Sequence, residues 1–344
     1  MYSAKFGKPA TEYACLSALL LAVILLNGCH GPDKPRMRWG AFFGSPTGMK
    51  FPDPANLGAH SFKLDLSETN GMVYTCKGGF VDIGHVREAA DRTRYLKGVV
   101  YQNLIRKKPE FSFRVLEPSR YRVKISYPPG WDNRSPEERE QMVNEISFHL
   151  GQYFAHMSMI WHEILSWHGY ATLVIFPDTI SAFSWEDSYS DLLGTRLGVQ
   201  ALRDRQRPYD EAVTKLIYEA LKELDVQPVE VAHRAAKWVE GQWYKGGLYF
   251  LVDMKMHNFD VGFDDGSISP WLVPEICPGA VARLYPVPSL QLLEQYGLKM
   301  EIEMEPRVMV KGKIYDSIGL SRDSLLNPQI HFPLLMQHIE SQSE

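Results

Sequence analysis

This sequence lacks several features that would by themselves identify a class of protein. It has no internal repeat and no low-complexity tract, and after residue 26 it has no apolar run of eighteen residues or more. We therefore expect no second segment that could span a membrane, and a soluble body. The formal net charge is only −4, with both signs spread along the chain, so we expect no nucleic-acid partner.

The N-terminus carries the most informative pattern. Two lysines precede an apolar run over residues 16–26 that is too short to span a bilayer and is typical of a secretory signal. The run ends in Leu-Asn-Gly-Cys at 26–29, which resembles a bacterial lipobox. This implies cleavage after Gly28 and lipidation of Cys29, which would anchor the chain in a membrane of the cell envelope, facing the periplasm. The alternatives are an uncleaved anchor or an ordinary exported protein.

The residue after the lipobox cysteine bears on which membrane is involved. His30 follows Cys29, where an aspartate would favour retention in the inner membrane of a Gram-negative host. If the host is Gram-negative, we therefore expect the outer membrane rather than the inner one.

Few cysteines remain once the signal is cleaved and Cys29 is acylated. Only Cys76 and Cys277 are left, and in an oxidising compartment two cysteines can form a disulfide. Their spacing in the sequence does not decide whether they meet. The predicted organisation is a signal peptide at 1–28, an acylated cysteine with a Gly- and Pro-rich tether at 29–70, and a single globular domain at 71–344.

Helical patterns dominate the middle of the chain. The longest runs from Ser135 to His168, where Ser-Pro-Glu-Glu at 135–138 provides an N-cap, a proline at the first helical position and early acidic residues. Apolar residues recur along it every three or four positions, so we expect this helix to be central to the domain. Further helices are predicted over residues 82–104, 184–203, 209–224, 229–243 and 331–341.

Strand patterns are shorter. Residues 120–127 alternate strictly between polar and apolar side chains, and 170–176 is a candidate for a short buried strand. Residues 248–256 and 300–305 have β character. The predicted fold class is α+β: a mainly helical core with a long central helix and a small, mostly antiparallel sheet contributed by the C-terminal third.

The first candidate site is a glycine-rich turn at 74–87 that leads into a helix. Asp82 is expected to cap the helix, and His85 lies in its first turn, where backbone donors favour an anion. His85 is a candidate metal ligand or base; alternatively, the glycines only let the chain turn sharply. Cys76 is a weaker candidate for a nucleophile paired with His85, because no orienting Asn or Asp is evident.

The second candidate site lies on the long helix, in Trp-His-Glu at 161–163. A zinc-peptidase helix carries histidines four residues apart, but position 166 is Ser166 and the next histidine is His168, so that motif is absent. Glu163 lies at the flank of the apolar stripe, where burial would require a cation, a donor or a metal. Glu163 and His162 are candidates for a metal or acid–base site, unless they are ordinary boundary residues.

Two acidic stretches are further candidates. Glu186, Asp187 and Asp191 lie at the start of a predicted helix, where acids usually complement the helix dipole but could also supply carboxylate ligands. The turn at 260–266 has acids and glycines but lacks the spacing and terminal glutamate of an EF-hand loop. An ordinary turn is predicted there.

Four blocks of the sequence are specific in combination. They are YTCKGGFVDIGHVREAAD, WHEILSWHG, SAFSWEDSYSDLLG and the closing NPQIHFPLLM. Together they resemble a bacterial lipoprotein family of unknown function, domain of unknown function 4056, over residues 38–340. The resemblance implies an exported, lipid-anchored envelope protein and assigns no reaction.

Two functional hypotheses follow. In the first, the chain is an envelope hydrolase in which His85, His162 and Glu163 hold a divalent metal such as zinc, with His85 and Glu163 as catalytic residues. Carboxylates of Glu186 or Asp187 would complete the site. In the second, it is a non-catalytic envelope lipoprotein that binds a protein or peptidoglycan, or supports an assembly. Close approach of His85 to His162 or Glu163 would favour the first hypothesis.

Overall fold

The computed structural model describes residues 32–38, 49–63, 67–170, 181–247 and 250–343. The predicted signal peptide, Cys29 and nearly all of the strand predicted at 170–176 lie outside these residues. The chain divides into two compact units, Met1–Asp33 and Lys34–Glu344. Every element described below belongs to the second unit, in which Met49, Leu57 and His60 are already buried.

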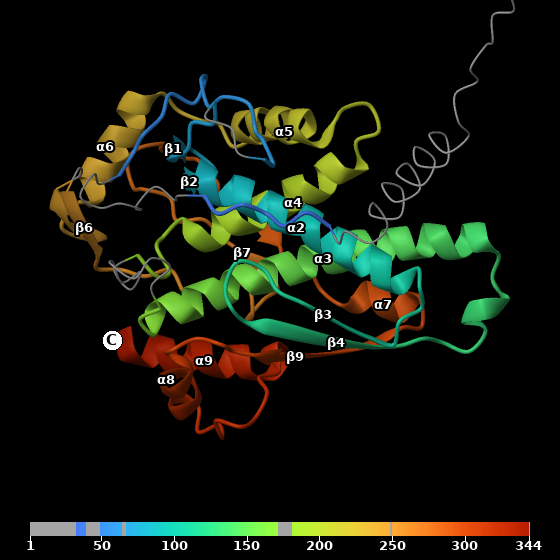
Figure 1. Ribbon diagram of the computed structural model, residues 1–344. Helices are drawn as coiled ribbons and strands as arrows, with labels where there is room; N and C mark the ends of the chain where they lie inside the picture. Colours follow the sequence, from blue (N-terminus) through green and yellow to red (C-terminus); the bar gives the residue numbers. More distant parts are fainter. Residues whose placement is uncertain (1–31, 39–48, 64–66, 171–180, 248–249, 344) are drawn as a thin grey trace, which may run out of the picture. The chain divides into compact units, whose positions relative to one another are not determined.

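Three long helices pack against one another at the centre of this unit (Figure 1). They are α2 (Ile83–Leu104), α3 (Pro136–Trp167) and α4 (Asp187–Arg203), and each contacts the other two. Glycines allow the close approach to α2. A Cβ on Gly151 of α3 would lie 2.7 Å from the backbone nitrogen of Lys97, and one on Gly194 of α4 would lie 2.3 Å from the carbonyl oxygen of Val86.

The starts of α2 and α3 follow the predictions. Asp82 caps α2 by accepting a hydrogen bond from the Gly84 N–H at 2.7 Å. Ser135 and Glu138 form a reciprocal capping box at the start of α3, with Pro136 as its first residue. The capping pattern in the sequence therefore located both helices correctly.

Helix α4 begins at Asp187, three residues later than predicted. Phe183 has a positive φ of 54°, which takes the chain out of helical geometry, and the Ser184 N–H donates to the Asp187 carboxylate at 3.0 Å. The predicted start at Ser184 is therefore wrong: the cap-like residues form a turn ahead of the helix.

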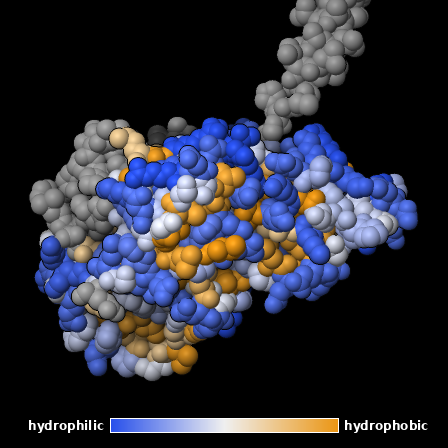
Figure 2. Space-filling model, turned by 90° about the horizontal axis from the view of Figure 1, so that it is seen from below, coloured by the Kyte–Doolittle hydropathy of each residue, from blue (hydrophilic) through white to orange (hydrophobic). Residues whose placement is uncertain are grey.

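The outer helices cover the central three. They are α5 (Tyr209–Glu223), α6 (Val229–Val239), α7 (Gln291–Gln295), α8 (Lys311–Ser317) and α9 (Pro328–Ser343), with a 3₁₀ turn η1 (Trp131–Asn133) before α3. Helix α6 ends before the predicted residue 243, because the backbone of Glu240 is extended and Gly241 has a positive φ. Seen from the side of α8 and α9, the surface mixes apolar patches with polar residues (Figure 2).

The sheets are small and antiparallel. The largest has three strands in the order β3 (Glu110–Phe113), β4 (Arg120–Ser126) and β9 (Lys299–Glu305). The remaining strands form two-stranded pairs: β1 (Met72–Thr75) with β2 (Gly79–Asp82), β5 (Tyr244–Gly247) with β6 (Phe250–Met254), and β7 (Ser267–Ile268) with β8 (Tyr285–Pro286).

The α+β class is confirmed, but the predicted origin of the sheet is not. Two of the three strands in the largest sheet come from the middle of the chain, not from the C-terminal third. The reason is the alternation of β4, which buries Tyr121, Val123 and Ile125 in the same core cluster as Ile302 and Met304 of β9. Strand β9 therefore adds to a hairpin that precedes α3.

Cys76 and Cys277 form a disulfide, with their Cα atoms 5.5 Å apart. It joins the turn between β1 and β2 to the segment between β7 and β8. The sulfur of Cys76 is thus unavailable as a nucleophile, which removes the Cys–His hypothesis. Disulfides are typical of proteins outside the reducing cytoplasm. No helix among the described residues is long and apolar enough to cross a membrane.

Candidate functional site

Six ionisable side chains from the central helices and the turns before them come together in the core. We call them the acidic cluster: Asp82, His85, Glu163, Glu186, Asp187 and Asp191. The five acids are at most 5% exposed. Burial at this level disfavours the charged form of every carboxyl group, so the arrangement of partners decides the chemistry.

His85 projects from the first turn of α2 toward the start of α4. Its Nδ1 lies 3.3 Å from Oδ1 of Asp187 and 3.4 Å from Oδ1 of Asp191, and its side chain is 23% exposed. Burial lowers the pKa of His85, but the charges of Asp187, Asp191 and Asp82 outweigh this and raise the pKa well above its usual value. A carboxylate on one ring nitrogen fixes the orientation of the imidazole, as in acid–base sites.

Glu163 faces the same carboxylates from α3. Its Oε2 accepts a hydrogen bond from the Phe183 N–H at 2.7 Å. Phe183 is buried with a φ of 54°, and its carbonyl accepts from the Asn258 N–H at 2.8 Å. Such a backbone is strained for a bulky residue and persists only where its surroundings hold it. Burial and the charge of Asp187 raise the pKa of Glu163 to about 8.

Glu186 is the least compensated member of the cluster. It is 1% exposed, and neither of its carboxyl oxygens has a hydrogen-bond partner among the described residues. Burial, together with the charges of Asp187 and Asp82, raises its pKa well above the usual value. Oδ1 of Asp191 also lacks a hydrogen-bond partner in the described part of the chain.

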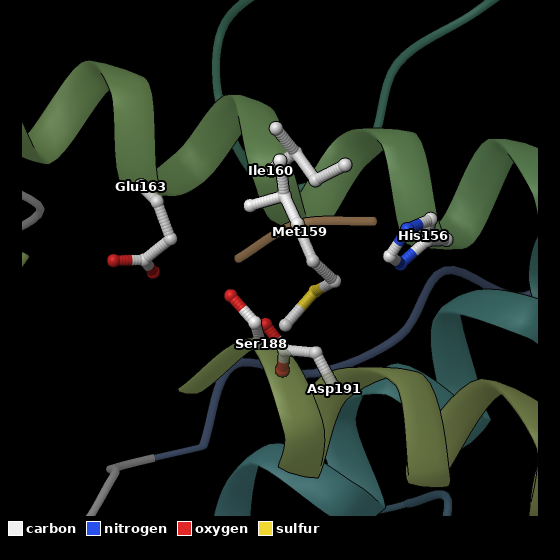
Figure 3. Close-up of a pocket in the computed structure, with 7 residues that line it drawn as sticks. His156, Met159, Ile160, Glu163, Ser188 and Asp191 are labelled. Carbon is white, nitrogen blue, oxygen red and sulfur yellow. The ribbon is translucent and has the colours of Figure 1, made fainter. Parts of the chain in front are cut away.

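A small cavity separates α3 from α4 beside the cluster (Figure 3). His156, Met159, Ile160, Glu163, Ser188, Asp191 and Val261 line it. Its volume of about 10 Å³ is room for about one water molecule. Burial lowers the pKa of His156 to about 4, so this wall of the cavity is neutral at physiological pH. The carboxyl groups of Glu163 and Asp191 are the other ionisable groups that line the cavity.

His162 belongs to a different environment from its neighbour Glu163. Its Nδ1 lies 3.0 Å from Oε1 of Glu117, and the same Oε1 lies 2.9 Å from Nη2 of Arg92. Burial lowers the pKa of His162, but the hydrogen bond and charge of Glu117 raise it to about 9. Arg92 also contacts Glu88, at 2.6 Å.

A second buried group of charged side chains adjoins Arg92 and Glu88, because the backbone N–H of Arg38 donates to Glu88. Arg38 bridges Asp91 at 2.6 Å and Glu68 at 3.0 Å, and His60 contacts Asp91 at 3.1 Å. We call the whole set the balanced network: Arg38, His60, Glu68, Glu88, Asp91, Arg92, Glu117 and His162. Each of its acids has an arginine partner, through side chain or backbone.

The structure brings two of the three predicted metal ligands to one cluster and separates the third. Glu163 and His85 both lie around Asp187 and Asp191, whereas His162 is paired with Glu117. No three His, Cys, Asp or Glu side chains of the described residues are placed to hold a metal ion. His85, His162 and Glu163 therefore do not form a ligand set in this structure.

The remaining sequence candidates are placed as follows. Glu186 and Asp187 lie in the acidic cluster, as expected for accessory carboxylates. Asp260 closes a turn by accepting from the N–H groups of Gly262 at 3.1 Å and Ser269 at 3.0 Å, so the 260–266 segment is the ordinary turn that was predicted. The sequence analysis predicted Asp82 only as a helix cap and not as a member of the acidic cluster. Its spacing of three residues from His85, which places both on one side of the helix, was the available signal.

Comparison with known proteins assigns this chain to a protein family. Residues 51–248 match the family described as "Protein of unknown function (DUF4056)", and this stretch contains the whole acidic cluster. No curated protein and no solved structure is significantly similar to the chain. Because the match extends over more than half of its length, the chain belongs to the DUF4056 family.

Proposed function

We propose that the acidic cluster is the catalytic centre of a hydrolase in a lipid-anchored envelope protein, with Glu163 and His85 as its catalytic residues. The observation that carries this proposal is their convergence. These residues are 78 positions apart in sequence, on α2 and α3. His85 contacts Asp187 and Asp191 of α4, and Glu163 lines one cavity together with Asp191. A helical core does not need such an arrangement, because buried acids without cationic partners destabilise it.

The geometry supports complementary roles for the two residues. Hydrolysis needs one group to take a proton from water and another to protonate the leaving group. Glu163 is fixed by the Phe183 N–H and borders a cavity with room for about one water molecule. His85 is oriented by Asp187 and Asp191 and is partly exposed, so it can reach a substrate that approaches from solvent. Glu163 would then activate the water when it is ionised, which its raised pKa of about 8 favours at alkaline pH, and His85 would protonate the leaving group.

The anchor is supported by the lipobox-like residues 26–29 and by the disulfide, which fits an oxidising compartment. Mass spectrometry of the N-terminal peptide tests it: an acylated Cys29 is expected, and Cys29→Ser should move the protein from the membrane fraction to the soluble one. An N-terminus that begins at Met1, or an unmodified Cys29, would contradict the lipid anchor.

Activity assays test the hydrolase. The full chain is screened against amide, ester and glycosidic substrates, including peptidoglycan fragments. Glu163→Gln and His85→Gln should each lower turnover by about 10²–10⁴-fold. His162→Gln is the matched control, because His162 neighbours Glu163 in sequence but contacts Glu117. Circular dichroism confirms that each variant is folded.

Two outcomes would favour the alternative, a non-catalytic binding or assembly factor. One is the absence of turnover across the whole panel. The other is turnover that survives Glu163→Gln in a folded protein. The burial of the cluster and the small size of the cavity are the observations that favour this alternative.

A further inference from the structure

The acidic cluster holds more potential negative charge than its described surroundings compensate. Among the described residues, His85 is the only basic side chain in ion-pair contact with Asp187 and Asp191. Both oxygens of Glu186 lack a hydrogen-bond partner within the described part of the chain, although this side chain is 1% exposed. Burying an uncompensated carboxylate costs several kcal/mol, so the cluster must take up either protons or another cation.

The spacing of donor atoms favours a metal ion over protons alone. Nδ1 of His85 lies 3.3 Å and 3.4 Å from the two aspartate oxygens. Two ligands that share a cation at about 2.0–2.2 Å are themselves about 3.0–3.5 Å apart. These separations are longer than a good charged hydrogen bond, which is about 2.7–2.9 Å. Each of these two pairs is therefore spaced more like neighbouring ligands than like a tight ion pair.

We propose that the acidic cluster binds one divalent cation through Nδ1 of His85 and carboxylate oxygens of Asp187, Asp191 and Glu186. One imidazole with three carboxylates suits a first-row transition ion such as Mn²⁺ or Zn²⁺ better than Ca²⁺, which prefers oxygen ligands throughout. Side chains of the cluster must shift to close around the ion, since no three acidic or imidazole groups of the described residues already surround a common point. Neither carboxyl oxygen of Glu186 has a hydrogen-bond partner among the described residues that such a shift would break.

This inference concerns the same cluster as the proposed hydrolase and refines it. With the cation bound, His85 would be a ligand rather than the proton donor proposed above, and Glu163 would be the one acid–base group beside the ion. The site differs from the sequence hypothesis in its members, because the ligands His162 and Glu163 are replaced by Asp187 and Asp191 of α4 and by Glu186, the residue before that helix. Ion binding is measured without a substrate, so failure of the cation site and failure of the hydrolase are distinguishable.

Titration calorimetry tests the site directly. The full chain, purified in detergent and stripped with a chelator, is titrated separately with MnCl₂, ZnCl₂, MgCl₂ and CaCl₂. We expect one equivalent of Mn²⁺ or Zn²⁺ to bind, and Glu186→Gln and Asp191→Asn each to weaken binding at least ~10-fold. Glu145→Gln is the control, because Glu145 is an α3 acid outside the cluster that pairs with Arg203 at the surface.

Thermal unfolding separates a ligand from a structural residue. If Glu186 is a ligand, the metal-free Glu186→Gln variant should unfold at the same or a higher temperature than the metal-free parent, because an uncompensated carboxyl has been removed. The cation should raise the unfolding temperature of the parent only. The proposal is overturned if no cation binds the parent, or if Glu186→Gln and Asp191→Asn bind it as tightly as the parent. A cluster that takes up protons only would give the first of these results.

Discussion

Helix α2 carries two buried groups of charges that differ in their partners rather than in their burial. Its first turn contributes His85 to the acidic cluster, and its next turns contribute Glu88, Asp91 and Arg92 to the balanced network. In the network, burial raises the pKa of Glu117, but Arg92 and His162 outweigh this and lower it to about 2. In the cluster, burial and a neighbouring acid raise the pKa of Glu163 to about 8.

The comparison separates a structural from a functional arrangement of acids. Where each carboxylate pairs with an arginine, the ion pairs hold segments of the chain together, and a structural role accounts for them. Where acids gather around one histidine, folding stability is lowered, and perturbed groups of this kind are characteristic of catalytic and binding sites. The two groups should therefore respond in opposite ways to loss of a charge.

Removing Arg92, one of the two arginines of the balanced network, should have the largest effect. Arg92→Met leaves Glu88 and Glu117 buried without their shared partner, so the free energy of unfolding should fall by about 3–5 kcal/mol. Denaturant titration measures this. A loss below about 1 kcal/mol, comparable to that of an exposed ion pair, would show that the network is not the stabilising group we infer.

Separating the helices that build the cluster should have an intermediate effect. A methyl group on Gly194 would collide with the carbonyl of Val86 on α2, so Gly194→Ala should cost about 1–3 kcal/mol and move His85 away from Asp187. Gly312→Ala on α8 is the control, because its Cβ would meet only the flexible end of Arg322. Equal stability of the two variants in denaturant titration would contradict the close packing of α2 on α4.

The pH dependence of stability should show the smallest effect. Burial raises the pKa of Glu68, but Arg38 outweighs this and lowers it from 4.5 to about 2. A depressed carboxyl pKa stabilises the fold above pH 4.5, and this stabilisation is lost as the pH falls toward 2. Glu68→Gln should therefore cost about 1 kcal/mol at pH 6 and progressively less below pH 4.5. A cost that is the same at pH 6 and pH 3 would rule out the ion pair as its source.

Local signals in the sequence were sufficient for most helices but not for the site. Capping residues and apolar periodicity located α2 and α3, because those interactions lie within a few residues of one another. The late start of α4 depends on the left-handed Phe183, which is held by Asn258 from a distant segment. No local pattern reports such a contact.

The fate of the His162–Glu163 pair shows the same limit. Adjacent residues on a helix point about 100° apart, so at most one of them could face α4. Which one does so depends on Glu117, which pairs with His162 and is itself paired with Arg92, and on the Phe183 N–H, which donates to Glu163. These partners come from three other parts of the chain, and only the tertiary structure brings them together.

The position of the disulfide in the sequence determines how late in the production of the chain it can form. Cys76 and Cys277 are 201 positions apart, and Cys277 lies beyond the stretch that matches the family. A chain that is translocated from its N-terminus must therefore deliver every helix from α2 to α6 before this bond can close. Until then the turn that leads into α2 has no covalent cross-link to the segment between β7 and β8. In the exported protein that we propose, oxidation of this pair would mark the point at which nearly the whole domain has crossed the membrane.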